Sequence, residues 1–119
     1  MLKAKVIARL SKLTKTKMSD KVIKLETENE LNKIIKSQKK SGEKINILFY
    51  SLWDEHCEKL VNSLDGYRKQ KPLYLVDSFS MPHAFVIYKT TKLPHLVSLN
   101  KDKVQSEDYL PMVYKSLGL

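Results

Sequence analysis

Strand-like and helix-like segments alternate along residues 20–119, and this alternation constrains the fold more than any other feature. Short aliphatic and aromatic runs are separated by segments whose apolar residues recur at the spacing of a helix face. Such alternation predicts one α/β domain with a mixed central β-sheet flanked by helices. The predicted strands are 22–25, 45–50, 72–76 and 95–99; the predicted helices are 26–38, 54–70, 80–88 and 106–117; and the turn at 100–103 leaves room for one more short strand.

Two local signals support these boundaries. Glu30 follows Thr27 by three positions, which is the capping-box pattern of a helix start. Residues 45–50 are almost entirely aliphatic or aromatic, which favours a central strand buried on both faces.

The positive charge is concentrated in residues 1–19. This segment holds six of the 22 basic residues and none of the 13 acidic ones, so it carries +6 of the formal net charge of +9. Its apolar residues recur at helical spacing, which predicts a basic amphipathic arm (1–19) preceding the domain (20–119). The basic residues of this arm are Lys3, Lys5, Arg9, Lys12, Lys15 and Lys17.

Two interpretations of the arm stay open. Its composition is typical of a mitochondrial targeting segment, although such segments prefer Arg to Lys; the alternative is a solvated Lys-rich extension of a cytoplasmic protein. If the arm binds a partner, its charge suits the phosphates of ribosomal RNA, anionic lipid or protein. Arg9 and Arg68 are the only arginines, which argues against base-specific readout of nucleic acid.

Several classes of protein are excluded by composition. The single cysteine, Cys57, excludes an internal disulfide, a CxxC pair and a four-cysteine zinc site. The chain has three glycines and neither a GxGxxG nor a GKS/GKT motif, so no nucleotide cofactor is expected. No apolar run reaches the roughly 18–20 residues of a transmembrane segment. We therefore expect no cofactor, no metal and no membrane span.

One segment carries a family resemblance. Residues 49–57 read Phe-Tyr-Ser-Leu-Trp-Asp-Glu-His-Cys. This resembles the active-site strand and helix start of the thioredoxin-like superfamily, Phe-Trp-Ala-x-Trp-Cys-Gly-Pro-Cys, with Phe49, Trp53 and Cys57 at matching positions. The resemblance implies a thioredoxin-like fold over residues 20–119.

A second motif agrees with the first in order and spacing. Pro82, Tyr88 and Pro94 match the family's Asn-Pro-x5-Tyr-x5-Pro pattern. The resemblance implies that Pro94 is the cis-proline that faces the active-site loop, and such cis bonds are rare enough to be structural signatures.

The departures from the family pattern concern its chemistry. Asp54 stands where the family has its nucleophilic cysteine, and only the resolving position keeps sulfur, as Cys57. Leu48 stands where the family has a buried acid, and Glu55 and His56 replace the Gly-Pro pair. Because disulfide exchange needs two thiols, the resemblance implies a redox-inactive site.

Cys57 on its own leaves an alternative open. A buried structural cysteine is the favoured interpretation, because free cysteines usually behave as small buried hydrophobes. The alternative is a single-cysteine oxidoreductase or a glutathione-dependent enzyme that uses Cys57. His56 and His95 add the hypothesis of a Cys–His pair or a metal site, although no ligand spacing supports a metal.

The vestigial site then comprises Trp53, Asp54, Cys57 and Pro94. Trp53 either anchors a partner or covers the edge of the core. The tyrosines are expected in the core or half-buried, and the lysine clusters on a solvated surface. We expect a redox-inactive accessory subunit of a large assembly, such as a mitochondrial ribosome or respiratory complex, by analogy with other subunits of this fold.

Overall fold

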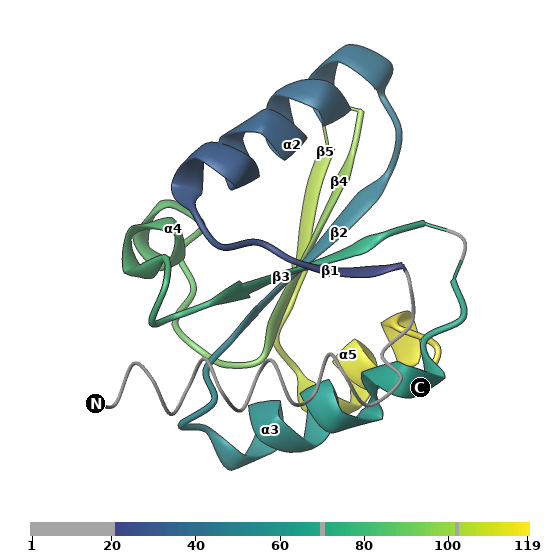
Figure 1. Ribbon diagram of the computed structural model, residues 1–119. Helices are drawn as coiled ribbons and strands as arrows, with labels where there is room; N and C mark the ends of the chain where they lie inside the picture. The colour runs from purple at the N-terminus through teal and green to yellow at the C-terminus, as the bar shows by residue number, and fades with distance from the viewer. Residues whose placement is uncertain (1–20, 70, 102) are drawn as a thin grey trace.

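A five-stranded mixed β-sheet forms the centre of the molecule (Figure 1). The computed structural model describes residues 21–69, 71–101 and 103–119. The strand order is β1-β3-β2-β4-β5. The strands are β1 (Val22–Lys24), β2 (Ile45–Tyr50), β3 (Leu73–Asp77), β4 (His95–Asn100) and β5 (Lys103–Glu107). The predicted mixed sheet and its helical flanks are confirmed.

The two halves of the sheet differ in strand direction. β3 pairs in parallel with both β1 and β2, whereas β4 runs antiparallel to β2 and β5 antiparallel to β4. β2 therefore lies at the centre of the sheet, and all six of its residues are buried. This confirms the central position predicted from its apolar composition.

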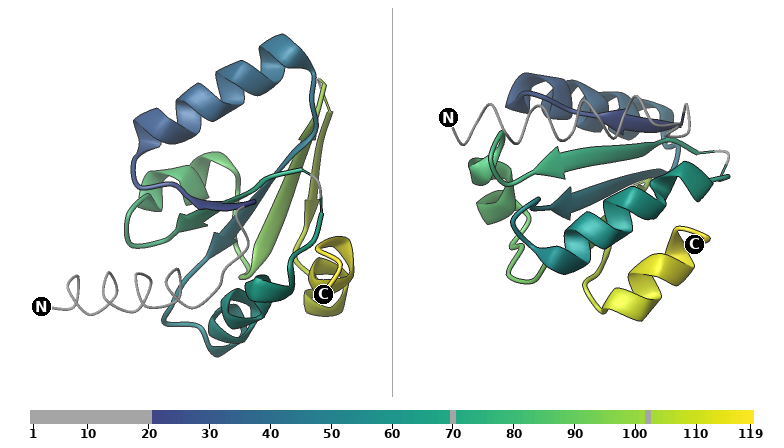
Figure 2. Two further views of the ribbon diagram at one scale, coloured as in Figure 1. Left: turned by 45° about the vertical axis from the view of Figure 1, so that its right-hand side comes forward. Right: turned by 60° about the horizontal axis from the view of Figure 1, so that its bottom comes forward.

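Helices cover both faces of the sheet (Figure 2). On one face, α2 (Glu28–Ser41) and α4 (Pro82–Ile87) pack over Ile47 and Phe49 of β2. On the other face, α3 (Glu55–Asn62) and α5 (Leu110–Ser116) pack over residues of β2, β3 and β4. Side chains of a strand alternate between faces, so β2 supplies both cores.

The first helix has the predicted cap. The Thr27 hydroxyl accepts a hydrogen bond from the Glu30 N–H at 3.2 Å, and the Glu30 carboxylate accepts one from the Thr27 N–H at 3.0 Å. The helix runs to Ser41, three residues past its predicted end, and stops at Gly42, whose φ of 73° suits glycine. The buried Gln38 amide donates to the Lys101 carbonyl at 3.2 Å, which ties this helix end to the β4–β5 turn.

The largest boundary errors concern two other predicted helices. The helix expected over 54–70 ends at Asn62 and continues only as a 3₁₀ turn, Ser63–Gly66, because this stretch is rich in poor helix formers. The helix expected from Ser106 begins instead at Leu110, with Pro111 in its first turn. Ser106 and Glu107 remain in β5, where they pair with Val97 and Leu96.

The predicted basic arm, residues 1–19, lies outside the described residues. Its helical character and its use for targeting or for contacts with RNA, lipid or protein therefore stay predictions. Within the described part of the chain, none of the helices combines the length and the apolar character that a membrane span needs.

Candidate functional site

Loops from four strands meet at one edge of the sheet. The register pairs Tyr50 with Asp77, Phe49 with His95, and Leu96 with Glu107. The ends of β2, β3 and β5 and the start of β4 therefore share this edge. We call it the site edge, formed by residues 51–54, 78–81, 88–94 and 108–109. It holds Trp53, Asp54 and Pro94 of the predicted vestigial site, whereas Cys57 lies in the first turn of α3.

Asp54 caps the helix that follows β2. Its carboxylate accepts a hydrogen bond from the Cys57 N–H at 3.0 Å, and its carbonyl accepts one from the Glu58 N–H at 3.0 Å. A carboxylate at this position satisfies free N–H groups and interacts favourably with the helix dipole. The family resemblance implies a nucleophilic thiol at position 54. In this chain the Asp54 carboxylate stands there and caps the helix instead.

The sulfur of Cys57 is buried. The residue is 0% exposed and packs in the core formed with α3 and α5, beside Leu48, Tyr50 and Leu60. Burial raises the pKa of the Cys57 thiol from 9.0 to about 12; a hydrogen bond with the Ser51 backbone opposes this, and the Asp54 carboxylate adds to it. The thiol is therefore protonated at neutral pH.

The family's buried acid has no counterpart at position 48 of this chain. Leu48, at the position of the family's buried acid, is fully buried and apolar. The neighbouring Tyr50 hydroxyl has no hydrogen-bond partner among the described residues, and its pKa is raised by burial and then by the Asp77 charge. A proton cannot be passed from Cys57 to a carboxylate at position 48, as the implied family chemistry requires.

Pro94 directly precedes β4, and His95 is the first residue of that strand at the site edge. The Leu93–Pro94 peptide bond is cis, and Pro94 is buried. The His95 ring is buried on the α2/α4 face, with its Nδ1 atom 2.8 Å from the Thr90 hydroxyl and its centroid 6.1 Å from that of Phe49. Burial lowers the His95 pKa, and the charge of Asp108 partly opposes this.

The predicted Cys–His pair does not form at His95. His95 lies among residues of the α2/α4 face, whereas Cys57 belongs to the core on the other face. His56, the other histidine considered, is exposed. Among the described residues, no group of three or more His, Cys, Asp or Glu side chains is placed to hold a metal ion.

Three aromatic side chains are exposed at the site edge. Trp53 is 59% exposed, Tyr109 is 63% exposed and Phe79 is 39% exposed. They follow β2, β5 and β3, respectively. The prediction that the tyrosines are buried or half-buried is wrong for Tyr109, which lies beyond the end of β5. Sequence reasoning missed Phe79, although an aromatic residue between two serines after a strand is a usable signal.

Hydrogen bonds hold the loops that carry these aromatic residues. The Trp53 N–H donates to the Ser51 hydroxyl at 3.2 Å. The buried Asp77 carboxylate accepts from the N–H of Phe79 at 2.7 Å and from that of Ser80 at 2.9 Å. The Ser78 N–H donates to the Tyr50 carbonyl at 3.0 Å, which joins the two loops.

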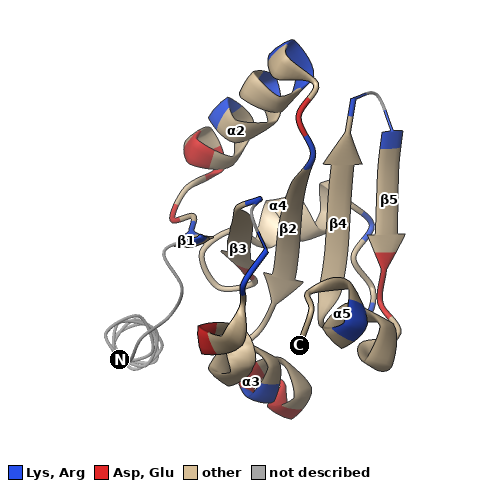
Figure 3. Cartoon of the chain, turned by 90° about the vertical axis from the view of Figure 1, so that its right-hand side faces the viewer, with Lys and Arg blue, Asp and Glu red and all other residues tan. Residues whose placement is uncertain are grey.

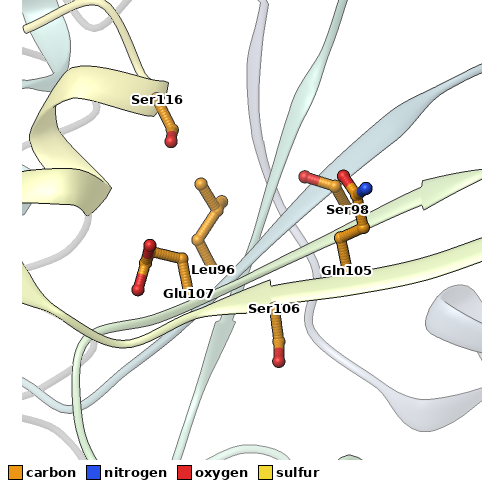
Figure 4. Close-up of a pocket in the computed structure, with 6 residues that line it drawn as sticks. All are labelled: Leu96, Ser98, Gln105, Ser106, Glu107 and Ser116. Carbon is orange, nitrogen blue, oxygen red and sulfur yellow. The ribbon is translucent and has the colours of Figure 1, made fainter.

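A pocket of about 460 Å³ lies between β4, β5 and α5 (Figure 4). The Ser98 hydroxyl at its wall donates to the Asn46 side-chain oxygen at 2.7 Å. None of the predicted site residues lies there. The pocket is lined by Leu96, Ser98, Gln105, Ser106, Glu107 and Ser116.

Solved structures of thioredoxins are similar to this chain. Thioredoxin NaTrxh from Nicotiana alata matches with a TM-score of 0.68 and 15% identity over 81% of this chain and 89% of that one. The Fasciola hepatica thioredoxin matches with a TM-score of 0.65 and 20% identity over 81% of this chain and 96% of that one. Arabidopsis thaliana thioredoxin O1 matches with a TM-score of 0.66 and 15% identity over 81% of this chain and 96% of that one. No protein-family model and no curated protein matches. The fold is thioredoxin-like, as the resemblance implied.

Proposed function

We propose that this thioredoxin-like chain is a redox-inactive accessory subunit that binds a protein partner through its site edge. The observation that carries the proposal is the pairing of Asp54 with the backbone of Cys57, which puts a capping carboxylate at the nucleophile position and leaves the sulfur buried. The fold's usual scaffold is retained, whereas the groups that disulfide exchange needs are replaced.

The state of Cys57 argues against thiol chemistry. With a pKa of about 12, on the order of one thiol in 10⁵ is ionised at pH 7. Cys57 is also the only cysteine of the chain, so an intramolecular disulfide is impossible. The buried, protonated thiol also argues against the alternative of a single-cysteine oxidoreductase or glutathione-dependent enzyme.

The exposed aromatic residues support protein binding. Trp and Tyr are enriched among the residues that dominate interface energetics. Trp53, Phe79 and Tyr109 stand on loops held by hydrogen bonds, so little conformational freedom is lost when a partner binds. Of the two interpretations of Trp53, its exposure favours the partner anchor.

The charge of the chain supports a place in a large assembly. The +6 of residues 1–19 suits ribosomal RNA, anionic lipid or an acidic protein surface. The composition of this segment favours a mitochondrial ribosome or respiratory complex over a cytoplasmic location.

Purification of the tagged, full-length chain from its source cells tests the proposal. We expect the double variant Trp53→Ala/Tyr109→Ala to lose its stoichiometric partners at least tenfold relative to the unmodified chain. The matched control is Val86→Ala/Ile87→Ala, which removes exposed apolar side chains from α4 instead. Equal retention by both variants would refute binding at the site edge, and partner-free chain with thiol-transfer activity would favour the enzyme alternative.

A further inference from the structure

β5 is the outermost strand of the sheet on the side of β4 (Figure 3). Within the described residues, no strand pairs with its outer side, and residues 103–106 are exposed. A free edge of this kind offers unpaired main-chain groups to another strand. We propose that two copies of this chain associate by antiparallel pairing of β5 with β5.

The charges of β5 are self-complementary. Lys103, Gln105 and Glu107 alternate along the strand and therefore share one face, with the lysine at the start and the glutamate at the end. Antiparallel pairing centred on Gln105 places Lys103 opposite Glu107 of the second copy, and Glu107 opposite its Lys103. Opposite charges in directly facing positions stabilise a sheet. A two-fold interface repeats this ion pair on both sides of the axis.

The main-chain geometry permits the same register. Asn100 pairs with Lys103, and only two residues lie between them. In a hairpin with a two-residue loop, the two residues that flank the loop exchange both of their main-chain hydrogen bonds. Counting along the strand, Lys103, Gln105 and Glu107 direct their N–H and C=O groups toward β4. Val104 and Ser106 direct theirs outward. Pairing centred on Gln105 brings Val104 opposite Ser106 of the second copy, so the outward groups meet.

Neighbouring registers fit less well. A slip of the register by two residues keeps the outward main-chain groups facing each other but moves the centre of pairing to Val104 or Ser106. Either Lys103 then faces Gln105 and Glu107 lies beyond the end of the facing strand, or Glu107 faces Gln105 and Lys103 lies beyond it, so the Lys103–Glu107 pairs are lost. The chosen register also brings the side chain of Val104, which is 64% exposed, against the second strand. The charge pattern and the main-chain pattern therefore select one arrangement.

This interface lies away from two of the three aromatic residues of the proposed partner site; the third, Tyr109, follows β5. Trp53 and Phe79 follow β2 and β3, the strands in the interior of the sheet, and pairing at β5 leaves both uncovered. Because a five-residue strand buries less area than a standard interface, the dimer is weak and forms at high protein concentration.

Sedimentation equilibrium of the full-length chain at concentrations up to about 1 mM tests the proposal. We expect the unmodified chain to dimerise. The single variants Lys103→Glu and Glu107→Lys place like charges opposite one another, so each dissociates about tenfold more readily. A 1:1 mixture of the two variants restores complementarity and forms heterodimers, and the double variant K103E/E107K forms homodimers again.

A second variant tests the main-chain pairing. Val104→Pro removes an outward N–H group that β4 does not use, so the fold persists and the dimer is lost. Far-ultraviolet circular dichroism checks that the Val104→Pro variant is folded. If this variant does not fold, the charge-reversal series alone tests the proposal. A monomeric unmodified chain at 1 mM overturns the proposal. The proposal is also overturned if the dimer survives both single charge reversals, or if it survives Val104→Pro in a chain that is still folded. Either result places the contact between the copies elsewhere.

Discussion

The carboxylate of Asp54 accepts a hydrogen bond at 3.0 Å from the main-chain N–H of Cys57, three residues further along the chain. The bond makes the acidic residue a structural part of the helix start. It also holds a negative charge near a buried thiol, which adds to the effect of burial on the thiol pKa. Both effects oppose formation of a thiolate, which is the reactive species in disulfide exchange.

Cys57 should label slowly in the native protein. A pKa of about 12 instead of 9.0 lowers the thiolate fraction about 10³-fold, and burial restricts access further. We expect the reaction with an aromatic disulfide reagent at pH 7.5 to be at least 100-fold slower in the native state than in 6 M guanidinium chloride. A Cys57→Ala/Ser41→Cys variant, with one exposed thiol, is the control. Native labelling as fast as in this control would favour the enzyme alternative.

Removal of the Asp54 cap should destabilise the domain. Asp54→Ala leaves the Cys57 N–H without its acceptor, and loss of such a cap costs about 1 kcal/mol in the free energy of unfolding. Asp54→Ser retains a capping oxygen and should lower the free energy of unfolding by only about 0.3 kcal/mol. Urea denaturation of the three proteins measures the difference. Equal stability of the alanine and serine variants would show that the cap contributes nothing.

Asp54→Cys should restore a disulfide pair. The resemblance places residues 54 and 57 at the two cysteine positions of the family, so we expect oxidised glutathione to link them. Mass spectrometry after alkylation should find no free thiols in the oxidised variant. Glu55→Cys, which has the wrong spacing, should keep its thiols or form mixed disulfides. If the Asp54→Cys variant also keeps both thiols free, the equivalence of the positions is refuted.

Acidification should destabilise the domain through His95. Burial lowers the pKa of His95 in the folded chain, whereas in the unfolded chain the pKa is near its ordinary value of 6.5. Below pH 6.5 the unfolded chain therefore binds more protons than the folded chain, which favours unfolding. The free energy of unfolding should therefore be retained above pH 6.5 and fall as the pH decreases below 6.5, through the lowered pKa of the folded state. His95→Asn should flatten this dependence, while Asp108→Asn should steepen it. The exposed His56 supplies the control, His56→Gln, which should leave the profile unchanged.

The hydroxyl of Tyr50 should contribute nothing to stability. It is buried without a hydrogen-bond partner among the described residues, so Tyr50→Phe removes an uncompensated polar group. We expect unchanged stability or a gain of up to about 1 kcal/mol. Tyr67 is the matched control, because its hydroxyl donates to the Lys71 carbonyl at 2.7 Å. Tyr67→Phe should lose about 1 kcal/mol, and a similar loss for Tyr50→Phe would contradict the prediction.

Local signals in the sequence predicted the features that depend on few residues. The pattern of Thr27 and Glu30 located the first helix, and the composition of residues 45–50 located the central strand. Features that depend on distant partners were missed. Ser106 and Glu107 resemble a helix start, but pairing with β4 keeps them extended. The exposure of Tyr109 was missed because burial is decided by the packing of whole elements.

The position of β2 between a parallel and an antiparallel half has a consequence for cooperativity. β2 joins the two halves, because β3 and β4 do not pair with each other. Any partial opening that releases β2 breaks its pairing with both β3 and β4 and exposes β2 side chains that belong to both cores. Such an opening is costly, so we expect the domain to unfold as one unit. The site edge, assembled from loops of both halves, exists only while that unit is intact.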